Sequence, residues 1–398
     1  MIFTKIMGYV SSVATNKNRI LNHTRLIKEQ AGLLSASIPN ERLLCRAGHI
    51  ELQLTDKCSL NCPNCHFRGL GDKQFSFEWL DNVIKFVQPK AITLAGGGEP
   101  TIYPRFNDAV LKLAEIPEVQ IGLITNGTIY PHGSWVRHIK WVRVSFYSID
   151  DGTYSGKSIV LRGIVLNNIG RYLRESGIPN VGVHFLFYRK NMSDIILFAK
   201  EVYSRFREDR ESFQKMHIQF KPAFIMARPS HLTSKLHEEN IEFLPSNSQV
   251  EDILSNFEYE FSADEEFREF LHSQSNFQVF NQLANGYLDE LVNVTNPGNF
   301  PLKVSENKKC YVCLAYRLID PSGFIYPCLT LAEHRSEKFS LGHISELPKI
   351  DVDRLRGFRM AATECCNKFF CRNWSQNQIV GEYMKKPART ELSDDCFF

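Results

Sequence analysis

The stretch "HIELQLTDKCSLNCPNC" (His49–Cys65) joins an apolar, strand-like run to three cysteines spaced Cys-x3-Cys-x2-Cys. The thiols are Cys58, Cys62 and Cys65, and no fourth cysteine is near. A tetrahedral zinc site takes four ligands, and disulfides take pairs. An iron–sulfur cube held by three thiolates instead keeps one iron open for another ligand. We interpret the stretch as such a cluster site, with a zinc or structural cluster site completed by a distant ligand as the alternative.

Composition and charge exclude several classes of protein. The chain has 398 residues, 43% of them hydrophobic, enough for one large domain with a smaller one or for two comparable domains. Its formal net charge of +3 predicts neither a nucleic-acid-binding surface nor an anionic-membrane-binding one. No apolar run approaches the roughly 20 residues of a membrane span. Eleven cysteines, clustered and without a secretory signal, indicate metal or redox ligands in a reducing cytoplasm.

The first 30 residues are basic, with no acidic residue before Glu29. This composition is typical of an organellar transit peptide. The alternative is an N-terminal helical arm, because Ile2, Ile6, Val10 and Val13 fall on one helical face.

Short apolar runs alternate with amphipathic segments from residue 49 to about residue 224. Strands are expected at 49–55, 91–98, 121–127, 142–149, 181–188 and 217–224. Helices are expected near 76–88, 106–116, 160–175 and 192–206. This alternation is typical of βαβ units and a parallel sheet, and six units predict an α/β fold with a partial (β/α)6 TIM-like barrel.

The pattern divides the chain into five segments. They are an N-terminal helical arm (1–45), the barrel (46–225), a helical insertion or bridging region (226–305), a cysteine-rich domain (306–375) and a C-terminal tail (376–398). In the insertion, helices are expected near 248–258, 264–273 and 277–292. Its last part, "NPGNFP" (296–301), is typical of a linker.

Three further motifs stand at the ends of the strands that follow the cysteines. "GGGEP" (Gly96–Pro100) ends the second strand, "ITNG" (Ile124–Gly127) ends the third, and "VRVSFYSID" (Val142–Asp150) is the fourth. Together with the cysteine spacing, this set resembles the radical S-adenosylmethionine (radical SAM) superfamily over about residues 45–225. Asn64 stands where that family usually has an aromatic residue before the third cysteine.

The resemblance implies that the three cysteines hold a 4Fe–4S cluster whose open iron binds SAM. It also implies that the backbone of Gly97 and Gly98 and the carboxylate of Glu99 hold the SAM ammonium group. Glycine permits close approach of the backbone, and a carboxylate pairs with a cation.

Asn126 and Ser145 are expected, on the same resemblance, to bond the ribose and the carboxylate of SAM. Arg162 opens the helix expected near 160–175. The family often has an arginine near the SAM carboxylate at such a position, and a solvated surface charge is the alternative for Arg162.

A second cysteine region follows, in which "CYVCLAYRLIDPSGFIYPC" (Cys310–Cys328) precedes "FSLGHISEL" (339–347) and "ECCNKFFC" (364–371). This order resembles the SPASM and twitch domains that follow many radical SAM barrels. Gly323 permits a β-hairpin between "RLID" and "FIYP" that brings two cysteines to one end. The ligands we expect for a single auxiliary 4Fe–4S cluster are Cys313, Cys328, Cys366 and Cys371, with Cys310 as the leading substitute. Zinc is the alternative metal.

Strand alternation predicts a polar inner face for the substrate pocket. The segment "HIQFKPAF" (217–224) has polar residues at alternate positions. Ser145 and Tyr147 fall on one face of the fourth strand. The candidates for contact with substrate are Tyr147, His184, His217, Gln219 and Lys221. The alternative is that this row faces solvent on an edge strand.

The reaction implied by the resemblance is reductive cleavage of SAM to a 5′-deoxyadenosyl radical, which abstracts a hydrogen atom from substrate. The expected substrate is a ribosomally made peptide that becomes cross-linked or epimerised. The alternative is oxidation, epimerisation or rearrangement of a small molecule such as an aminosugar or nucleoside, and the second alternative is a non-catalytic iron–sulfur scaffold. The expected protein partner is a reductant such as flavodoxin or ferredoxin.

Overall fold

The computed structural model describes most of the chain from residue 22 onward. The described residues are 22–60, 62, 65, 67, 71–146, 159–174, 177–187, 189, 191–209, 211, 215–222, 249, 252, 255–256, 259, 263–267, 269, 309–333, 335–360, 374–385 and 396–397. Outside them lie the first 21 residues of the expected helical arm, nearly all of the expected insertion, and Cys366 and Cys371.

The chain forms two compact units. The first comprises residues 1–57, 69–122 and 301–398, and the second comprises residues 58–68 and 123–300. The "GGGEP" motif and the second cysteine region therefore belong to the first unit. The first cysteine loop and the "ITNG" motif belong to the second unit.

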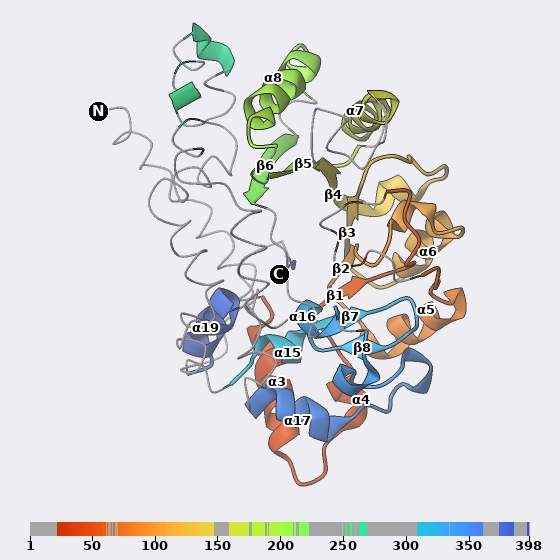
Figure 1. Ribbon diagram of the computed structural model, residues 1–398. Helices are drawn as coiled ribbons and strands as arrows, with labels where there is room; N and C mark the ends of the chain where they lie inside the picture. The colour runs from red at the N-terminus through yellow and green to blue at the C-terminus, as the bar shows by residue number, and fades with distance from the viewer. Residues whose placement is uncertain are drawn as a thin grey trace. The chain divides into compact units, whose positions relative to one another are not determined.

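The six strands expected between residues 49 and 224 are all present. They are β1 (His49–Leu52), β2 (Ala91–Leu94), β3 (Gln120–Thr125), β4 (Ile139–Phe146), β5 (Asn180–Phe187) and β6 (Met216–Pro222). Two more, β7 (Tyr316–Ile319) and β8 (Ile325–Tyr326), give the strand order β6-β5-β4-β3-β2-β1-β7-β8 (Figure 1). The pairs β1–β2, β4–β5 and β5–β6 are parallel, which confirms the α/β class with a mostly parallel sheet.

The helices expected between these strands are also present. They are the composite segment η1 (Phe77–Trp79), α5 (Leu80–Asn82) and η2 (Val83–Val87), then α6 (Phe106–Leu113), α7 (Ile159–Arg174) and α8 (Asp194–Phe206). Helices α3 (Thr24–Ser35) and α4 (Glu41–Leu44) precede the sheet, and α15 (Val312–Ala315), α16 (Leu329–Ala332), α17 (Val352–Met360) and α19 (Trp374–Tyr383) follow β6. None of the described helices is long and apolar enough to cross a bilayer.

Strands β2 and β3 are among those that end earlier than the sequence predicted. Strand β2 ends at Leu94, where residues as far as 98 were expected, and β3 ends at Thr125. The cause is the backbone of the glycines that follow, because Gly96, Gly97 and Gly127 have φ angles of +70°, +64° and +72°. Such angles turn the chain out of the extended conformation, so each motif forms a turn at a strand end.

In the first unit, β1 has one apolar face and one polar face. Ile50, Leu52 and Leu54 are completely buried on the apolar face. His49, Glu51 and Gln53 alternate with them and lie on the opposite face, as strand geometry requires. His49 bonds the hydroxyl of Thr93 on β2 at 2.8 Å, and burial lowers its pKa to about 3, so its imidazole is neutral.

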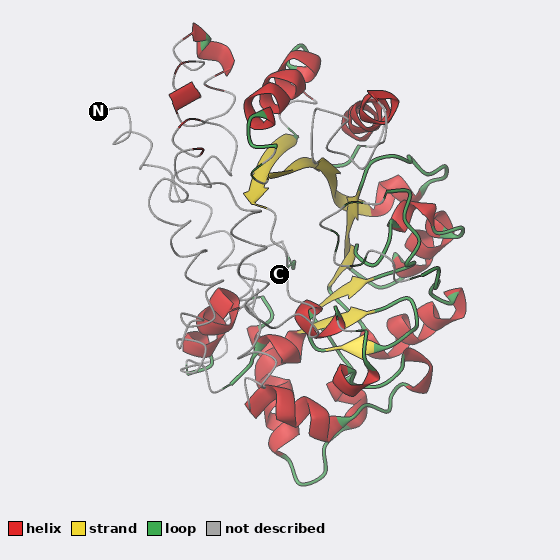
Figure 2. Ribbon diagram, viewed as in Figure 1, coloured by secondary structure: helices red, strands yellow, loops and turns green. Residues whose placement is uncertain are grey.

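In the second unit, β4, β5 and β6 alternate in the same way. The apolar face carries Val142, Val144 and Phe146 of β4, all buried. Phe146 stacks on Phe198 of α8 with ring centroids 5.0 Å apart, and Figure 2 shows α7 and α8 on one side of these strands. Ser145 of β4 and His184 of β5, which alternate with Phe146 and Phe185, therefore lie on the side opposite to α8.

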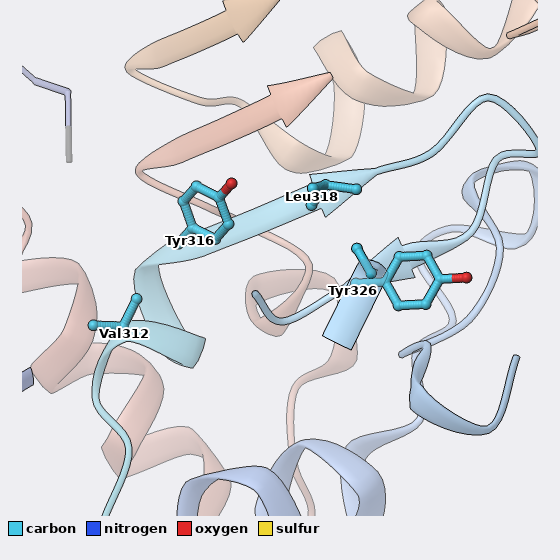
Figure 3. Packing of buried hydrophobic residues seen from close by; sticks show 5 residues of the cluster. Val312, Tyr316, Leu318 and Tyr326 are labelled. Carbon is cyan, nitrogen blue, oxygen red and sulfur yellow. The ribbon is translucent and has the colours of Figure 1, made fainter. Parts of the chain in front are cut away.

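The hairpin expected around Gly323 is present. Strands β7 and β8 pair antiparallel through Leu318 and Tyr326, and Gly323 has a φ of +88° in the turn. Asp320 closes this turn, because its Oδ1 accepts hydrogen bonds from the backbone N–H groups of Ser322 (2.9 Å) and Phe324 (3.0 Å). Side chains of α15, β7, β8 and α16 pack together beneath the hairpin; they are Val312, Tyr316, Leu318, Tyr326 and Ala332 (Figure 3).

This hairpin is part of the main sheet. Strand β7 pairs in parallel with β1, with His49 opposite Tyr316 and Glu51 opposite Leu318. The expected C-terminal tail also contributes structure: Asn377 of α19 donates to Lys309 O at 2.9 Å and accepts from the Tyr311 N–H, on either side of Cys310.

Arg317 of β7 is a buried cation that joins the N-terminal helices to the sheet. Only 2% of it is exposed. Its guanidinium donates to Leu44 O at 3.3 Å, to Gln30 Oε1 at 3.5 Å and to the carbonyls of Cys313 and Tyr316. Because carbonyl oxygens satisfy its donors, α3, α4, α15 and β7 are linked through one side chain.

The hairpin turn gives a prediction for stability. A Cβ at residue 323 would lie 2.4 Å from Nε2 of the His343 ring, and the φ of +88° strains any L-residue. We expect Gly323→Ala to reduce the free energy of unfolding by about 1–3 kcal/mol. The control is Gly357→Ala in α17, where a Cβ meets nothing within 4 Å and helix propensity gives a gain of about 0.5–1 kcal/mol. Denaturant unfolding of both variants checks this, and equal midpoints would show that the turn tolerates a side chain.

Candidate functional site

The "GGGEP" turn packs its backbone against the segment that leads to the first cysteine. Gly98 N donates to Thr55 O at 2.7 Å, and Glu99 N donates to Lys57 O at 2.8 Å. Lys57 directly precedes Cys58 in the sequence. A Cβ at residue 98 would lie 1.8 Å from Lys57 O, so only glycine permits this approach.

Glu99 is a buried carboxylate, with 3% of the residue exposed. Its Oε1 accepts from the backbone N–H of Thr101 at 3.1 Å and from the Thr101 hydroxyl at 2.7 Å. It thereby caps the short helix η3 (Pro100–Ile102). Glu99 is thus held in place by local contacts of one oxygen, a role that the sequence analysis did not assign to it.

Arg335 also reaches this turn, although the sequence analysis did not single it out. Its Nη2 lies 2.8 Å from Asp56 Oδ1 and 2.6 Å from Gln53 Oε1. A Cβ at Gly97 would lie 3.1 Å from the same Nη2. Burial raises the pKa of the Asp56 carboxyl, and the Arg335 guanidinium opposes that shift. Asp56, two residues before Cys58, was a visible signal in the sequence, whereas nothing local to Arg335 indicated its contact.

In the second unit, the three predicted cluster ligands lie in a loop with partly exposed thiols. Cys58 and Cys65 are exposed, and Cys62 is half-buried. A turn joins the last two, because Cys65 N donates to Cys62 O at 3.2 Å. Within the described part of the chain, no group of three or more Cys, His, Asp or Glu side chains is arranged to hold a metal ion. The ligand set therefore stays a prediction.

The "ITNG" turn holds the first of these cysteines. Asn126 Nδ2 donates to Ser59 Oγ at 3.0 Å and to Cys58 Sγ at 3.7 Å, while its Oδ1 accepts from Thr128 N at 3.0 Å. The hydroxyls of Ser59 and Thr128 are 2.8 Å apart. Asn168 of α7 fixes the turn by donating to Gly127 O at 2.8 Å. Asn126 thus orients the loop, a role different from the ribose or carboxylate contact that the sequence predicted.

The chemistry around Cys58 fits an iron–sulfur cluster. Its sulfur accepts hydrogen bonds from the backbone N–H of Leu60 at 3.4 Å and from the Asn126 amide. Donors of this kind stabilise thiolate charge and tune clusters. The close approach at Gly98 likewise fits a turn whose backbone contacts a ligand.

The register of the strands aligns three of the predicted polar residues. Ser145 of β4 is opposite His184 of β5, which is opposite Gln219 of β6. The next row back contains Gly182 opposite His217, where a Cβ on Gly182 would lie 2.5 Å from the His217 ring. His184 is 5% exposed and His217 is half-buried. Lys221 follows on β6 with the same alternation, and Tyr147 lies outside the described residues.

Arg162 is on α7 and pairs with Glu201 of α8. Both side chains are about one quarter exposed, at 28% and 26%. The two side chains form an ion pair between α7 and α8. The expected contact of Arg162 with SAM stays a prediction.

Three of the five predicted auxiliary-cluster cysteines are described, and all belong to the first unit. Cys313 is buried, while Cys310 and Cys328 are half-buried at opposite ends of the hairpin sequence. A hydrogen bond with Cys313 lowers the pKa of Cys310 and raises that of Cys313. Cys45, outside both clusters, bonds Pro348 O at 3.1 Å, and burial raises its pKa to about 12.

Comparison with known proteins identifies the class of the chain. The Radical SAM superfamily pattern matches residues 52–155, which include the first cysteine loop, "GGGEP" and "ITNG". Residues 52–155 are therefore a radical SAM domain, which supports an enzyme. Members of this superfamily use a 4Fe–4S cluster and SAM.

Similarity to individual proteins is lower. The tungsten-containing aldehyde ferredoxin oxidoreductase cofactor-modifying protein of Pyrococcus furiosus is 25% identical over 164 residues, 37% of this chain. The match spans 46% of that relative, less than half of its length.

Two solved structures also match over most of the chain at low identity. SuiB of Streptococcus suis, bound to its precursor peptide SuiA, is 13% identical with a TM-score of 0.49, covering 86% of this chain and 74% of SuiB. BtrN, in complex with AdoMet and 2-DOIA, is 14% identical with a TM-score of 0.38, covering 83% of this chain and 94% of BtrN.

The hydrogen bonds of Asn126 give a test of its role. Asn126→Ala removes both donors to Ser59 and Cys58 and the acceptor for Thr128, so we expect the cluster to be held about 10- to 100-fold more weakly. Iron retained after anaerobic reconstitution and exposure to a chelator measures this. Asn107→Ala on α6, where the half-buried asparagine donates to Asp108 Oδ1 at 3.2 Å, is the control and should retain iron as wild type does. Equal retention in both variants would contradict the positioning role.

Proposed function

We propose that this enzyme modifies a ribosomally made peptide by radical SAM chemistry. The observation that carries the chemistry is the docking of the Gly96–Glu99 backbone on Thr55 and Lys57, directly before Cys58, in a chain with the superfamily pattern. When bound, the cluster supplies the electron that cleaves SAM, and the resulting 5′-deoxyadenosyl radical takes a hydrogen atom from substrate.

Cys58, Cys62 and Cys65 are the residues that we assign to the cluster. Leu60 N and Asn126 hold the Cys58 sulfur through hydrogen bonds at 3.4 and 3.7 Å, which orients the first ligand. Cys65 N donates to Cys62 O at 3.2 Å, so a turn brings the other two cysteines close together in the loop.

The turn at residues 96–99 is the element that we assign to the SAM ammonium. Oε1 of Glu99 accepts from Thr101, which fixes the carboxylate that we assign to the cation. A carboxylate already buried and fixed by hydrogen bonds binds a cation with little loss of side-chain freedom.

The inner face of β4–β6 is the surface that we assign to the substrate. Ser145 and His184 occupy adjacent positions across β4 and β5, and Gln219 continues the row. Hydroxyl, imidazole and amide groups both donate and accept hydrogen bonds, as a peptide backbone does. The same groups suit the hydroxyls of a small molecule such as an aminosugar or nucleoside, which is the alternative substrate class.

An auxiliary 4Fe–4S cluster is the proposed role of the second cysteine region. Support comes from the hairpin of β7 and β8, whose turn is at Gly323. In the sequence, Cys313 comes before the first strand and Cys328 comes after the second. The adjacent Cys310 has a lowered pKa, which favours the thiolate that metals bind.

The relative from Pyrococcus furiosus is named as a cofactor-modifying protein, which fits an enzyme of this superfamily.

Substitution of the three loop cysteines tests the assignment of the first cluster. We expect the reconstituted wild type to hold about eight irons, and the Cys58/Cys62/Cys65→Ala variant to hold about four and form no 5′-deoxyadenosine under dithionite. Cys396→Ala, at a thiol outside both clusters, should behave as wild type. Continued 5′-deoxyadenosine formation by the triple variant would show that the first cluster lies elsewhere. One zinc and four irons in the wild type would contradict the auxiliary cluster.

A pair of substitutions separates the two roles of Glu99. Glu99→Gln keeps an oxygen that caps Thr101 but removes the charge, whereas Glu99→Ala removes both. If the carboxylate binds the SAM ammonium, both variants weaken SAM binding by about 1.5–3 kcal/mol with iron unchanged. Equilibrium binding of SAM measures this. Wild-type affinity in Glu99→Gln would restrict Glu99 to the capping role.

Transfer of deuterium from the substrate to 5′-deoxyadenosine tests the substrate class. A deuterated precursor peptide should transfer deuterium to 5′-deoxyadenosine, because hydrogen abstraction from substrate produces that compound. Transfer from a deuterated aminosugar or nucleoside, and none from peptide, would favour the alternative.

A further inference from the structure

We propose that Arg335 is a positioning residue that ties the SAM-binding turn to the C-terminal hairpin, so that SAM affinity depends on the hairpin carboxylate Asp320. This rests on the proposed function of the Gly96–Glu99 turn. All of the contacts that support it lie within the first unit.

The guanidinium of Arg335 lies between two buried carboxylates. Its Nη2 is 2.8 Å from Asp56 Oδ1, and its Nη1 is 3.1 Å from Asp320 Oδ2. The exposed fractions of the three side chains are 14%, 4% and 2% respectively. Two buried carboxylates repel each other, and the guanidinium between them offsets that repulsion.

On one side, Arg335 supports the end of β1 and the glycine turn. The same Nη2 donates to Gln53 Oε1 at 2.6 Å. Gln53 is completely buried, and a Cβ on Gly96 would lie 2.4 Å from its Nε2. A Cβ on Gly97 would lie 3.1 Å from Arg335 Nη2 and 3.0 Å from Asp56 Oδ1. The first two glycines of the motif thus pack directly against the side chains of Gln53, Asp56 and Arg335. A movement of these side chains changes the surface against which the turn packs.

On the other side, the contact is with the hairpin. Asp320 follows β7 and holds the turn through the N–H groups of Ser322 and Phe324 with Oδ1, which leaves Oδ2 for Arg335. The Tyr326 hydroxyl of β8 also lies 3.4 Å from Oδ2. Asp320 therefore links the guanidinium of Arg335 to both strands of the hairpin.

The backbone of Arg335 turns the chain just after helix α16. Its φ is +49°, a left-handed conformation that is common directly after a helix, and its N–H donates to Ala332 O at 3.0 Å. From this turn the side chain extends to Asp56 and Asp320.

The hairpin lies next to β1 in the sheet although it is remote from β1 in the sequence. Arg335 lies seven positions after Cys328 in the sequence, in the segment that leaves α16. A shift of this segment moves the guanidinium that supports the SAM-binding turn. The hairpin region is thus coupled to SAM affinity through one side chain and two carboxylates.

Asp320→Asn is the variant that tests the coupling. The asparagine oxygen still accepts from Ser322 and Phe324 and keeps the hairpin turn, while the charge that holds Arg335 is removed. We expect SAM to bind about 3- to 30-fold more weakly to the full-length, anaerobically reconstituted protein, with iron per chain unchanged. Arg335→Lys, which keeps the charge but cannot reach both carboxylates in a fork, should give an intermediate loss.

Asp351→Asn is the matched control. Asp351 also caps a local turn with Oδ1, at 2.8 Å from Arg354 N, and pairs an arginine with Oδ2, at 3.2 Å from Arg354 Nε. It is in the first unit and has no described contact with the glycine turn. Its substitution should leave SAM affinity within twofold of wild type.

Three outcomes decide the proposal. Unchanged SAM affinity in folded Asp320→Asn would overturn it, and so would equal losses in Asp320→Asn and Asp351→Asn. A fall in iron content parallel to the loss of SAM would also overturn it, because it would show general disruption. If Asp320→Asn does not fold, Arg335→Lys decides by the same criteria. A wild-type protein that binds no SAM would instead refute the proposed function.

Discussion

Strand β1 is hydrogen-bonded on both edges, to β2 on one side and to β7 on the other, and the first unit is organised around it. Its buried residues Ile50, Leu52 and Leu54 fix which face is apolar. The alternate residues lie on the opposite face, where Glu51 and Gln53 lie next to Gly96 of "GGGEP" and Glu51 accepts from Tyr316 of β7. Two segments far apart in sequence are thus brought to the same end of one strand because parallel neighbours share a direction.

Residues that the superfamily resemblance associates with SAM also hold the protein's own loops. Glu99 caps η3, and Asn126 bonds Ser59, Thr128 and Cys58. Preorganisation accounts for this double use, because a group that binds a ligand is more effective when its own position is already fixed by hydrogen bonds. The polar contacts of the loops and the proposed contacts with SAM are therefore parts of one arrangement within each unit.

The strands, the main helices and the hairpin could be predicted because their signals are local. Period-two alternation identified β4 and β6, and Gly323 marked the turn that its φ of +88° now explains. Strand ends were placed too late at β2 because apolarity continues into Ala95, whereas the backbone of Gly96 turns the chain. The contacts of Arg335, Arg317 and Asn377 could not be predicted, because each joins residues that are distant in the sequence.

The partnership of β1 with β7 also has a consequence for the order in which the newly made chain can fold. Tyr316 of β7 bonds Glu51 of β1 across 265 positions. At ribosomal rates of about 5–20 residues per second, β1 waits on the order of 15–50 s for this neighbour. During that time one edge of a strand with an apolar face is open, which invites pairing with other chains. Molecular chaperones that cover this edge, and delivery of iron and sulfide only after the hairpin has been synthesised, would therefore favour correct maturation in the cell.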